Sequence, residues 1–300
     1  MDTRVIIFGS GLISNSLRDH LKEEGISTLV TTRTNTTEVN VVLKELKNRN
    51  RGTVSDEIVC DTMEDYNKAV NDFRPTWAVM AIPLPPNELF NYFLSIEGCS
   101  KIHFSAPASD DAKNGNSSIK YAVTKYEHEK LVNECREVVL QIGFVPDFWE
   151  SNGVIRPGLS FETMLMCNLI ADGLNPLEGE ALEKFLKKVG YVSTSIGNVC
   201  KFCHALIANE ISYPKELVGR TIAMHSTQVW ERSQIIEALK NPCFENKNNR
   251  VAQTKPFKEF HEAFKGQFDT NDEDILSSIQ HSKVLYQQHK AKMIAIASAL

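Results

Sequence analysis

Residues 5–17 read Val5-Ile6-Ile7-Phe8-Gly9-Ser10-Gly11-Leu12-Ile13-Ser14-Asn15-Ser16-Leu17, and this stretch decides the fold. The apolar run Val5–Phe8 predicts a strand that is buried on both faces. After the glycines, Ile13, Leu17 and Leu21 recur every four residues, which predicts a helix. The chain therefore begins with a strand, a tight turn and a helix.

The turn between this strand and helix carries Gly9 and Gly11, two residues apart. Glycines there let the backbone turn sharply and approach a pyrophosphate held at the helix N-terminus. The third glycine of the dinucleotide-binding fingerprint is replaced by Ser14, which is small enough to allow close helix packing. We expect a dinucleotide at this turn, with contacts from Gly9, Ser10, Gly11, Leu12 and Ile13.

Length and composition limit the classes of protein to which this chain can belong. The 300 residues, 42% of them hydrophobic, suffice for one large α/β domain or for a nucleotide-binding domain with a smaller lobe. The net charge of -5 and the scattered basic residues argue against a nucleic-acid partner. No apolar run is long enough to span a membrane, and no secretory signal precedes the first strand. We therefore expect a cytoplasmic protein whose seven cysteines are reduced thiols.

Strands and helices alternate after the glycine turn. Apolar segments predict strands at 27–32, 57–61, 77–83 and 101–105. The pattern of residues 63–73 predicts a helix between the second and third of these strands. The polar segment Ser109–Ser118 predicts a loop. This alternation predicts an α/β fold with a Rossmann-like, doubly wound parallel sheet.

Residues at the ends of these strands are further candidates for cofactor binding. Arg33, directly after the second strand, favours a 2′-phosphate and so NADP over NAD, although a solvated arginine at a strand end is the alternative and NAD stays open. Asp61 either contacts the adenine or caps the following helix. The small Ala81 lets the backbone run beside the cofactor. The predicted contacts are Arg33, Thr34, Asp61, Thr62, Ala81, Ile82 and Pro83.

A helix predicted from Lys120 places Tyr121 and Lys125 one turn apart. A nearby ammonium lowers the pKa of a phenol, so Tyr121 is a candidate proton donor or acceptor, and Lys125 would also reach ribose hydroxyls. Tyr126 and Lys130 repeat the same spacing. Five residues rotate a helix by roughly 140°, so only one of the two pairs can face the cofactor.

Taken together, these features resemble the extended short-chain dehydrogenase/reductase family. The matches are the N-terminal glycine turn, Asp61 after the third strand, the serine after the fifth strand, and Tyr121-x-x-x-Lys125 followed by Glu129. The family usually carries an acid at the position of Glu129, which favours Tyr121 over Tyr126. By the same resemblance, residues 139–146 are similar to the sixth strand and residues 192–199 to a strand-to-helix segment of the substrate lobe.

The resemblance implies a two-part chain and a reaction class. It implies an NAD(P)-binding domain over residues 1–146, with Pro146 near the nicotinamide. A substrate lobe would follow over residues 147–244, whose chain can cross back to the sheet, and then a loop and helical extension over residues 245–300. The implied activity is hydride transfer at a carbonyl or alcohol carbon by an epimerase, dehydratase or reductase. A nucleotide sugar is the implied substrate class, and a homodimer through the Tyr121 helix is the implied assembly.

One departure from the family concerns the catalytic hydroxyl. The family normally supplies it from the second residue of a Ser-Ser or Ser-Thr pair, whereas Ser105 is followed here by Ala106. Either Ser105 or Ser109 substitutes, with Ser105 the candidate for orienting the substrate oxygen, or the hydroxyl is missing. In the last case the chain would bind NADP(H) as a sensor or scaffold without turnover.

The second half of the chain carries weaker signals. Cys200-x-x-Cys203-His204 has the spacing of haem attachment or half a zinc site, but no second pair lies nearby, and we expect an apolar helix and no metal. Trp149 or Asn152 either touches substrate or packs the lobe. We expect helices over 180–189 and 227–239, a lobe strand over 221–225 and a long helix over 274–300.

Overall fold

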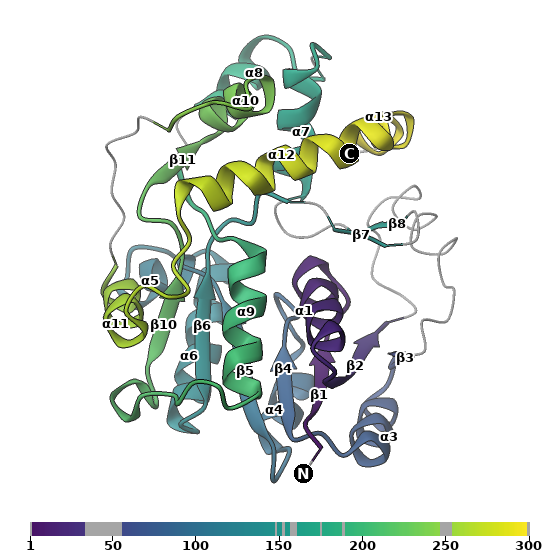
Figure 1. Cartoon of the computed structure of the whole chain (residues 1–300), viewed down its shortest axis with the longest axis vertical. Coiled ribbons are helices and arrows are strands. Elements are labelled where there is room, and N and C mark those ends of the chain that lie inside the picture. The colour runs from purple at the N-terminus through teal and green to yellow at the C-terminus, as the bar shows by residue number, and fades with distance from the viewer. Residues whose placement is uncertain are drawn as a thin grey trace.

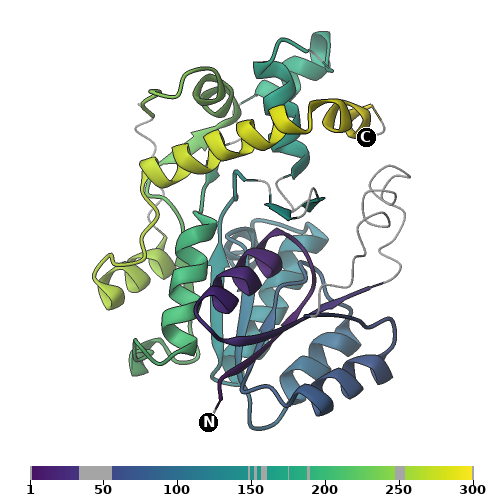
Figure 2. The same cartoon turned by 45° about the vertical axis from the view of Figure 1, so that its right-hand side comes forward.

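The computed structural model of the chain consists of a large sheet domain and a smaller helical lobe above it (Figure 1). The structure describes residues 2–33, 56–147, 149–151, 154–156, 161–174, 176–187, 190–246 and 254–298. The N-terminus lies below the sheet, and the C-terminal helices cross the upper lobe in both views (Figures 1 and 2).

The sheet has seven strands in the order β10-β6-β5-β4-β1-β2-β3, and every neighbouring pair is parallel. This confirms the predicted doubly wound, Rossmann-like sheet. The interior strand β1 is fully buried from Val5 to Phe8, as the apolar run predicts. The strands are β1 (Arg4–Phe8), β2 (Ser27–Thr32), β3 (Glu57–Val59), β4 (Trp77–Met80), β5 (Ser100–Ser105), β6 (Val138–Ile142) and β10 (Thr221–Met224).

Helices cover both faces of the sheet, and each face has its own apolar core. One core joins the strands to α1, α9 and α11 and contains Leu17 and Leu21 of the predicted first helix. The other core joins the opposite face to α3 and α4, with Val132 contributed by α6. The helices of this domain are α1 (Leu12–Glu23), α3 (Met63–Phe73), α4 (Asn87–Ser95), α5 (Ala108–Lys113), α6 (Lys120–Glu134), α9 (Ile196–Ile207), η1 (Lys215–Leu217) and α11 (Lys255–Phe264).

The upper lobe has a third apolar core, built around the fully buried Trp230 and Tyr286. A short antiparallel pair, β9 with β11, accompanies its helices, and a second pair, β7 with β8, lies between the lobe and α1 (Figure 1). The lobe elements are α7 (Phe161–Ala171), α8 (Gly179–Leu186), β9 (Gly190–Val192), β11 (Val229–Glu231), α10 (Arg232–Lys240), α12 (Asp272–Gln288) and α13 (Lys290–Ala297), and the second pair is β7 (Trp149–Ser151) with β8 (Val154–Arg156).

Gly143 marks the crossing where the chain leaves the sheet for the lobe. A Cβ at Gly143 would lie 2.1 Å from the carbonyl oxygen of Val192, so only glycine fits against the returning segment. The Gly143 N–H donates to Thr194 Oγ1 at 2.7 Å, and a bridge pairs Phe144 with Ser193. The two segments at the base of the lobe are therefore fixed to each other through backbone contacts.

Two elements differ from the sequence predictions in the sheet domain. Residues 109–118 are not wholly a loop, because α5 begins at Ala108; Asp110 and Asp111 in its first turn favour the helix dipole. The strand predicted for the lobe at 221–225 is β10, which pairs with β6 at the edge of the main sheet. Local sequence patterns contain no information on which sheet a strand joins, and this placement depends on the long-range pairing.

Three further boundaries also differ. The helix predicted from residue 227 begins at Arg232, because residues 229–231 form β11 and the Gln234 side chain accepts from the Glu231 N–H in a capping box. The long C-terminal helix is divided at His289 into α12 and α13. The fourth strand ends at Met80 rather than at residue 83.

Candidate active site

The carboxyl ends of the parallel strands bring the predicted cofactor residues to one edge of the sheet. Gly9 follows β1 with a φ of +109°, and a Cβ there would lie 2.9 Å from Ile82 Cγ1. The Ala81 N–H donates to the Phe8 carbonyl at 3.0 Å. The structure thus places the glycine turn directly against residues 81–82, as expected for a shared ligand site, while Pro83 follows in an exposed position.

The N-terminus of α1 is open at this edge. Gly11 is its N-cap and provides no side-chain cap, so within the described residues the first N–H groups of α1 have no acceptor. Gly11 has a φ of −82°, which any residue can adopt, and a Cβ on it would meet no atom within 4 Å. Among the described residues the space beside Gly11 is therefore open, and the helix dipole favours an anion there.

Arg33 and Asp61 lie beyond the ends of β2 and β3. Arg33 Nε donates to the Tyr66 hydroxyl at 3.4 Å, and Tyr66 stacks on Phe8 with ring centroids 5.8 Å apart. Thr62, not Asp61, caps α3, because its hydroxyl accepts from the Asp65 N–H at 3.2 Å. The capping alternative for Asp61 was wrong, and its adenine contact stays a prediction. Thr34 lies outside the described residues.

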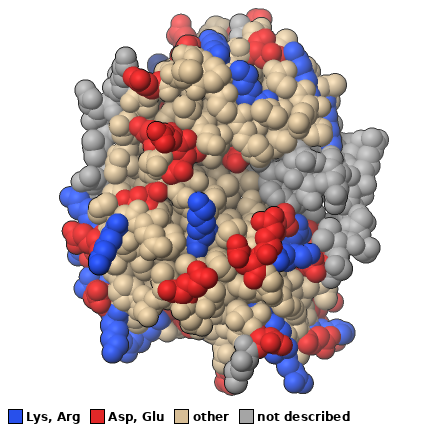
Figure 3. Space-filling view, viewed as in Figure 1, with Lys and Arg blue, Asp and Glu red and all other residues tan. Residues whose placement is uncertain are grey.

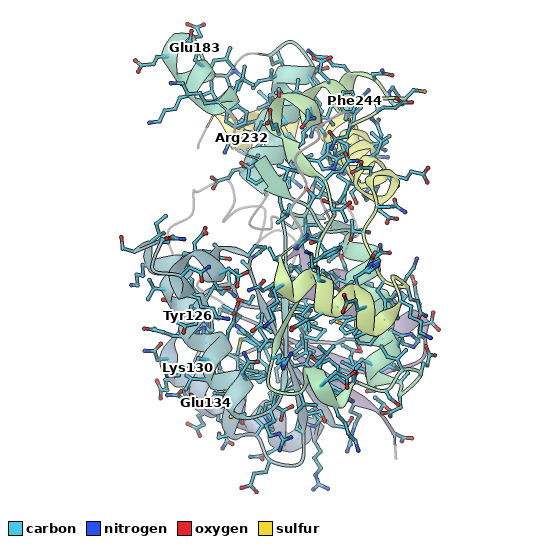
Figure 4. The ribbon with its side chains drawn as sticks, turned by 90° about the vertical axis from the view of Figure 1, so that its left-hand side faces the viewer. Tyr126, Lys130, Glu134, Glu183, Arg232 and Phe244 are labelled. Carbon is cyan, nitrogen blue, oxygen red and sulfur yellow. The ribbon has the colours of Figure 1, made fainter. Side chains whose placement is uncertain are left out.

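The two tyrosine–lysine pairs lie on different faces of α6, as the helical rotation predicts. Lys125 is 3% exposed and its Nζ donates to the Phe104 carbonyl at 2.8 Å, whereas Lys130 is solvent-exposed beside Glu134. Tyr126, Lys130 and Glu134 follow the outer side of the domain (Figure 4), where they line an open hollow. The Tyr121–Lys125 pair therefore has the inward register.

Burial changes the protonation of this inward pair. It lowers the pKa of Lys125 to about 8, which the Glu129 charge partly opposes, and it raises the pKa of Tyr121. The predicted lowering of the tyrosine pKa was wrong for the structure, because burial raises that pKa; the lysine ammonium donates to the Phe104 carbonyl. Within the described residues the Tyr121 hydroxyl has no hydrogen-bond partner, so it is available to a ligand as a neutral phenol.

Glu129 accepts hydrogen bonds from both candidate catalytic hydroxyls. Ser105 Oγ and Ser109 Oγ both donate to Glu129 Oε1, and Gln141 Nε2 donates to the same oxygen at 3.2 Å. Burial raises the pKa of Glu129, while these three hydrogen bonds lower it. Both hydroxyl protons are thus directed into the protein. The role of Ser105 toward a substrate oxygen stays a prediction.

Two histidines beside Lys125 had no sequence signal. His103 of β5 is fully buried, with neither ring nitrogen hydrogen-bonded, and His128 of α6 stacks on Phe90 with centroids 3.8 Å apart. Burial lowers the pKa of His103 well below its ordinary value and that of His128 to about 4. Both imidazoles are neutral at pH 7. Only the packing of α6 on the sheet reveals this cluster.

The chain passes from β6 into the predicted substrate lobe near Phe144 and Pro146. Pro146 is buried, and Phe144 stacks on Tyr191 with centroids 4.4 Å apart. Arg232 donates through Nε to the Tyr191 hydroxyl at 2.8 Å, and its guanidinium lies 4.4 Å from the Phe185 ring centroid. Figure 4 shows Arg232 in the upper lobe, with Glu183 above it. The Trp149 side chain and Asn152 lie outside the described residues.

The cysteine–histidine motif forms part of the apolar core. Cys200 and Cys203 are buried in α9, and burial raises the pKa of Cys200 to about 12. The apolar stripe predicted for this helix is confirmed: Val199, Cys203, Leu206 and Ile207 are all buried. Figure 3 shows acidic and basic side chains scattered over one face, between larger areas of uncharged residues. None of the helices in the described residues is long and apolar enough to cross a membrane.

Solved structures share this fold over nearly the whole chain. A search with family models and a search of curated protein sequences gave no match. dTDP-glucose 4,6-dehydratase from Bacillus anthracis in complex with NAD aligns with a TM-score of 0.65 at 10% identity, covering 98% of this chain and 99% of that one. UDP-glucose 4-epimerase from Bifidobacterium longum in complex with NAD+ and UDP has a TM-score of 0.62 at 11% identity, over 97% and 100%.

A plant reductase extends the comparison. Vestitone reductase from alfalfa aligns with a TM-score of 0.58 at 15% identity, covering 96% of this chain and 99% of that one. At these identities the likeness is one of fold. It confirms the α/β fold with a Rossmann-like parallel sheet that the sequence predicts.

Proposed function

We propose that this chain, built on the fold of those dehydratases, epimerases and reductases, is an NADP-dependent oxidoreductase or epimerase. It would transfer hydride between the nicotinamide and a carbonyl or alcohol carbon of a small molecule, with a nucleotide sugar as the substrate class. The observation that carries the proposal is the inward register of Tyr121 and Lys125, at the same sheet edge as the uncapped turn of α1. The fold of NAD-bound proteins supports a nicotinamide dinucleotide there.

The residues present fit such a cofactor. The open N–H groups at Gly11 and Leu12 would bind its pyrophosphate, Arg33 its 2′-phosphate and Asp61 its adenine. The bound dinucleotide supplies the hydride. Lys125, mostly protonated at pH 7 with its pKa of about 8, would bind ribose hydroxyls.

Tyr121 would exchange the proton with the substrate oxygen. Because burial raises its pKa, the phenol is protonated at neutral pH and is suited to donate that proton as a carbonyl is reduced. Within the described residues its hydroxyl has no other partner, so a substrate oxygen can accept from it without displacing a bond of the protein.

The first test is calorimetric titration of the purified protein with NADPH and separately with NADH. Tight NADPH binding with weak NADH binding supports the proposal, including Arg33, and equal binding of both refutes the NADP assignment alone. Absence of both refutes the proposal as a whole. For catalysis, Tyr121→Phe has a matched control in Tyr126→Phe, five residues further along α6. Only the first should abolish oxidation of NADPH by a carbonyl substrate while cofactor binding persists.

A second candidate is a sensor or scaffold that binds NADP(H) without turnover. The favouring observation is that Ser105 and Ser109 both donate to Glu129, so no serine hydroxyl proton of this pair is directed to a substrate. Tight NADPH binding together with no NADPH consumption across a panel of nucleotide sugars and simple carbonyl compounds would support this candidate.

A further inference from the structure

Asn15, in the first turns of α1, holds the backbone of the glycine turn. Its side chain is fully buried, and its Nδ2 donates to the carbonyls of Ser10 at 2.7 Å and of Gly11 at 2.8 Å. The backbone N–H of Asn15 also donates to the Gly11 carbonyl, at 3.1 Å. Three donors from one residue therefore fix two consecutive carbonyls on the same side of the turn.

Fixing these carbonyls also fixes the N–H groups that follow them. A trans peptide is planar, with its C=O and N–H directed oppositely. The Ser10 carbonyl shares a peptide with the Gly11 N–H, and the Gly11 carbonyl shares one with the Leu12 N–H. Because Asn15 holds both carbonyls on its own side, both N–H groups are directed away from it, and within the described residues neither has an acceptor. A Cβ on Gly11 would lie in open space.

We infer that Asn15 is a positioning residue that pre-organises the turn to bind a pyrophosphate, an inference that rests on the cofactor site proposed above. A purely structural role explains the residue poorly. Asparagine is a weak helix former, and Asn15 Oδ1 is buried without a donor. Burying the unsatisfied Asn15 Oδ1 costs stability. In return, Asn15 holds two carbonyls in place, which leaves the N–H groups of Gly11 and Leu12 open to a ligand.

The test compares Asn15→Ala and Asn15→Asp with Ser16→Ala, a control on the same helix. Binding is measured by calorimetry below the unfolding temperature of each variant, for NADPH, for NADH, for ADP-ribose and for adenosine, which has no pyrophosphate. We expect Asn15→Ala to raise the Kd of the cofactor and of ADP-ribose by the same factor, about tenfold. Asn15→Asp should raise it further, because a carboxylate faces two carbonyls and repels the phosphates. Adenosine affinity should not change.

The outcomes separate this inference from the proposed function. If wild type binds none of the dinucleotides, the proposed function fails. If wild type binds and Asn15→Ala binds as tightly as Ser16→Ala, or if adenosine affinity falls by the same factor as ADP-ribose affinity, the positioning role is refuted while the site stands.

Hydrogen exchange of the wild-type protein tests the same geometry if the Asn15 variants do not fold. The amides of Gly11 and Leu12 should exchange rapidly without cofactor and become protected when the cofactor binds. Protection of both amides in the cofactor-free protein would overturn the inference, because those groups would already have acceptors.

Discussion

Replacement of Lys125 by methionine should make the protein more stable and less able to bind its cofactor. The lysine is 3% exposed, and burial lowers its pKa from 10.5 to about 8. Folding at neutral pH therefore places an ammonium where water cannot solvate it. Methionine has a similar length, fills the same space without a charge and tolerates irregular surroundings.

The magnitude follows from the shift. A change from 10.5 to about 8 is roughly 2.5 pH units, and at about 1.4 kcal/mol per unit the buried charge costs about 3.5 kcal/mol of stability. The variant also loses the hydrogen bond from the ammonium to the Phe104 carbonyl, which is worth about 1.5–3 kcal/mol. We expect a net gain of about 0.5–2 kcal/mol at pH 7, measured as the free energy of unfolding in urea.

The pH dependence gives the sharper criterion. Between the folded pKa of about 8 and the unfolded value of 10.5, the unfolded lysine binds more protons, so its cost is full below pH 8 and disappears by pH 10.5. The buried thiols, whose pKa values are raised, lower stability at alkaline pH in both proteins and cancel in the difference. The advantage of Lys125→Met should therefore decline as pH rises from 8. A variant that is less stable than wild type at pH 7, or whose advantage is constant up to pH 10, would refute the buried-charge reasoning.

Three further predictions concern other described residues. Gly9→Ala should destabilise the fold by about 2–5 kcal/mol, because Gly9 has a positive φ and its Cβ would lie against Ile82. Gly11→Ala should change stability by less than about 1 kcal/mol but weaken cofactor binding. Denaturation and calorimetry on both variants check this, and equal losses of stability would contradict it. Gly143→Ala should cost about 2–4 kcal/mol, since its Cβ would collide with a backbone carbonyl, and a urea midpoint within error of wild type would disprove it. The imidazole of His281 donates through Nδ1 to Asp147 Oδ1 at 2.7 Å, and Asp147 raises the pKa of His281. The pair should stabilise wild type over His281→Gln by less than about 1 kcal/mol below pH 6.5, and this difference should vanish as pH rises through the raised pKa; a difference that grows with pH would reverse the assignment.

The sequence was most informative where one local stretch determines the structure. The glycine turn, the burial of Val5–Phe8 and the face of α1 all follow from spacing over a few residues. The two registers of α6 also follow from helical rotation, and Glu129 identified the inward one. These features could be predicted because neighbouring residues alone determine them.

Features that depend on long-range contacts could not be read from the sequence. α5 has a polar sequence typical of a loop, but Gln141 of β6 donates to Asp110 at 3.2 Å and to Ser109 at 2.9 Å, which attaches this segment to the sheet. Likewise, β10 has the apolar pattern of any buried strand, and Thr221 donates to Glu129 from the sheet edge. Gln141, which gave no inference from the sequence, joins these elements. Its role exists only in the folded arrangement.

The inner face of α6 departs from the usual pattern of a packed helix, and this departure is informative about function. A helix that packs on a sheet normally buries apolar side chains, but here Lys125, His128 and Glu129 are all nearly fully buried. Burial opposes the charged forms of Lys125 and Glu129 at pH 7, as their shifted pKa values show, while the lowered pKa of His128 costs stability only in acid. At pH 7 His103 and His128 are neutral, so Lys125 carries the positive charge of this cluster without a competing cation beside it. A fold selected for stability alone would replace these groups by leucine or methionine. Their burial next to Tyr121 therefore argues that α6 is maintained for the chemistry of the site, and a stabilised but binding-defective Lys125→Met is the direct consequence of that argument.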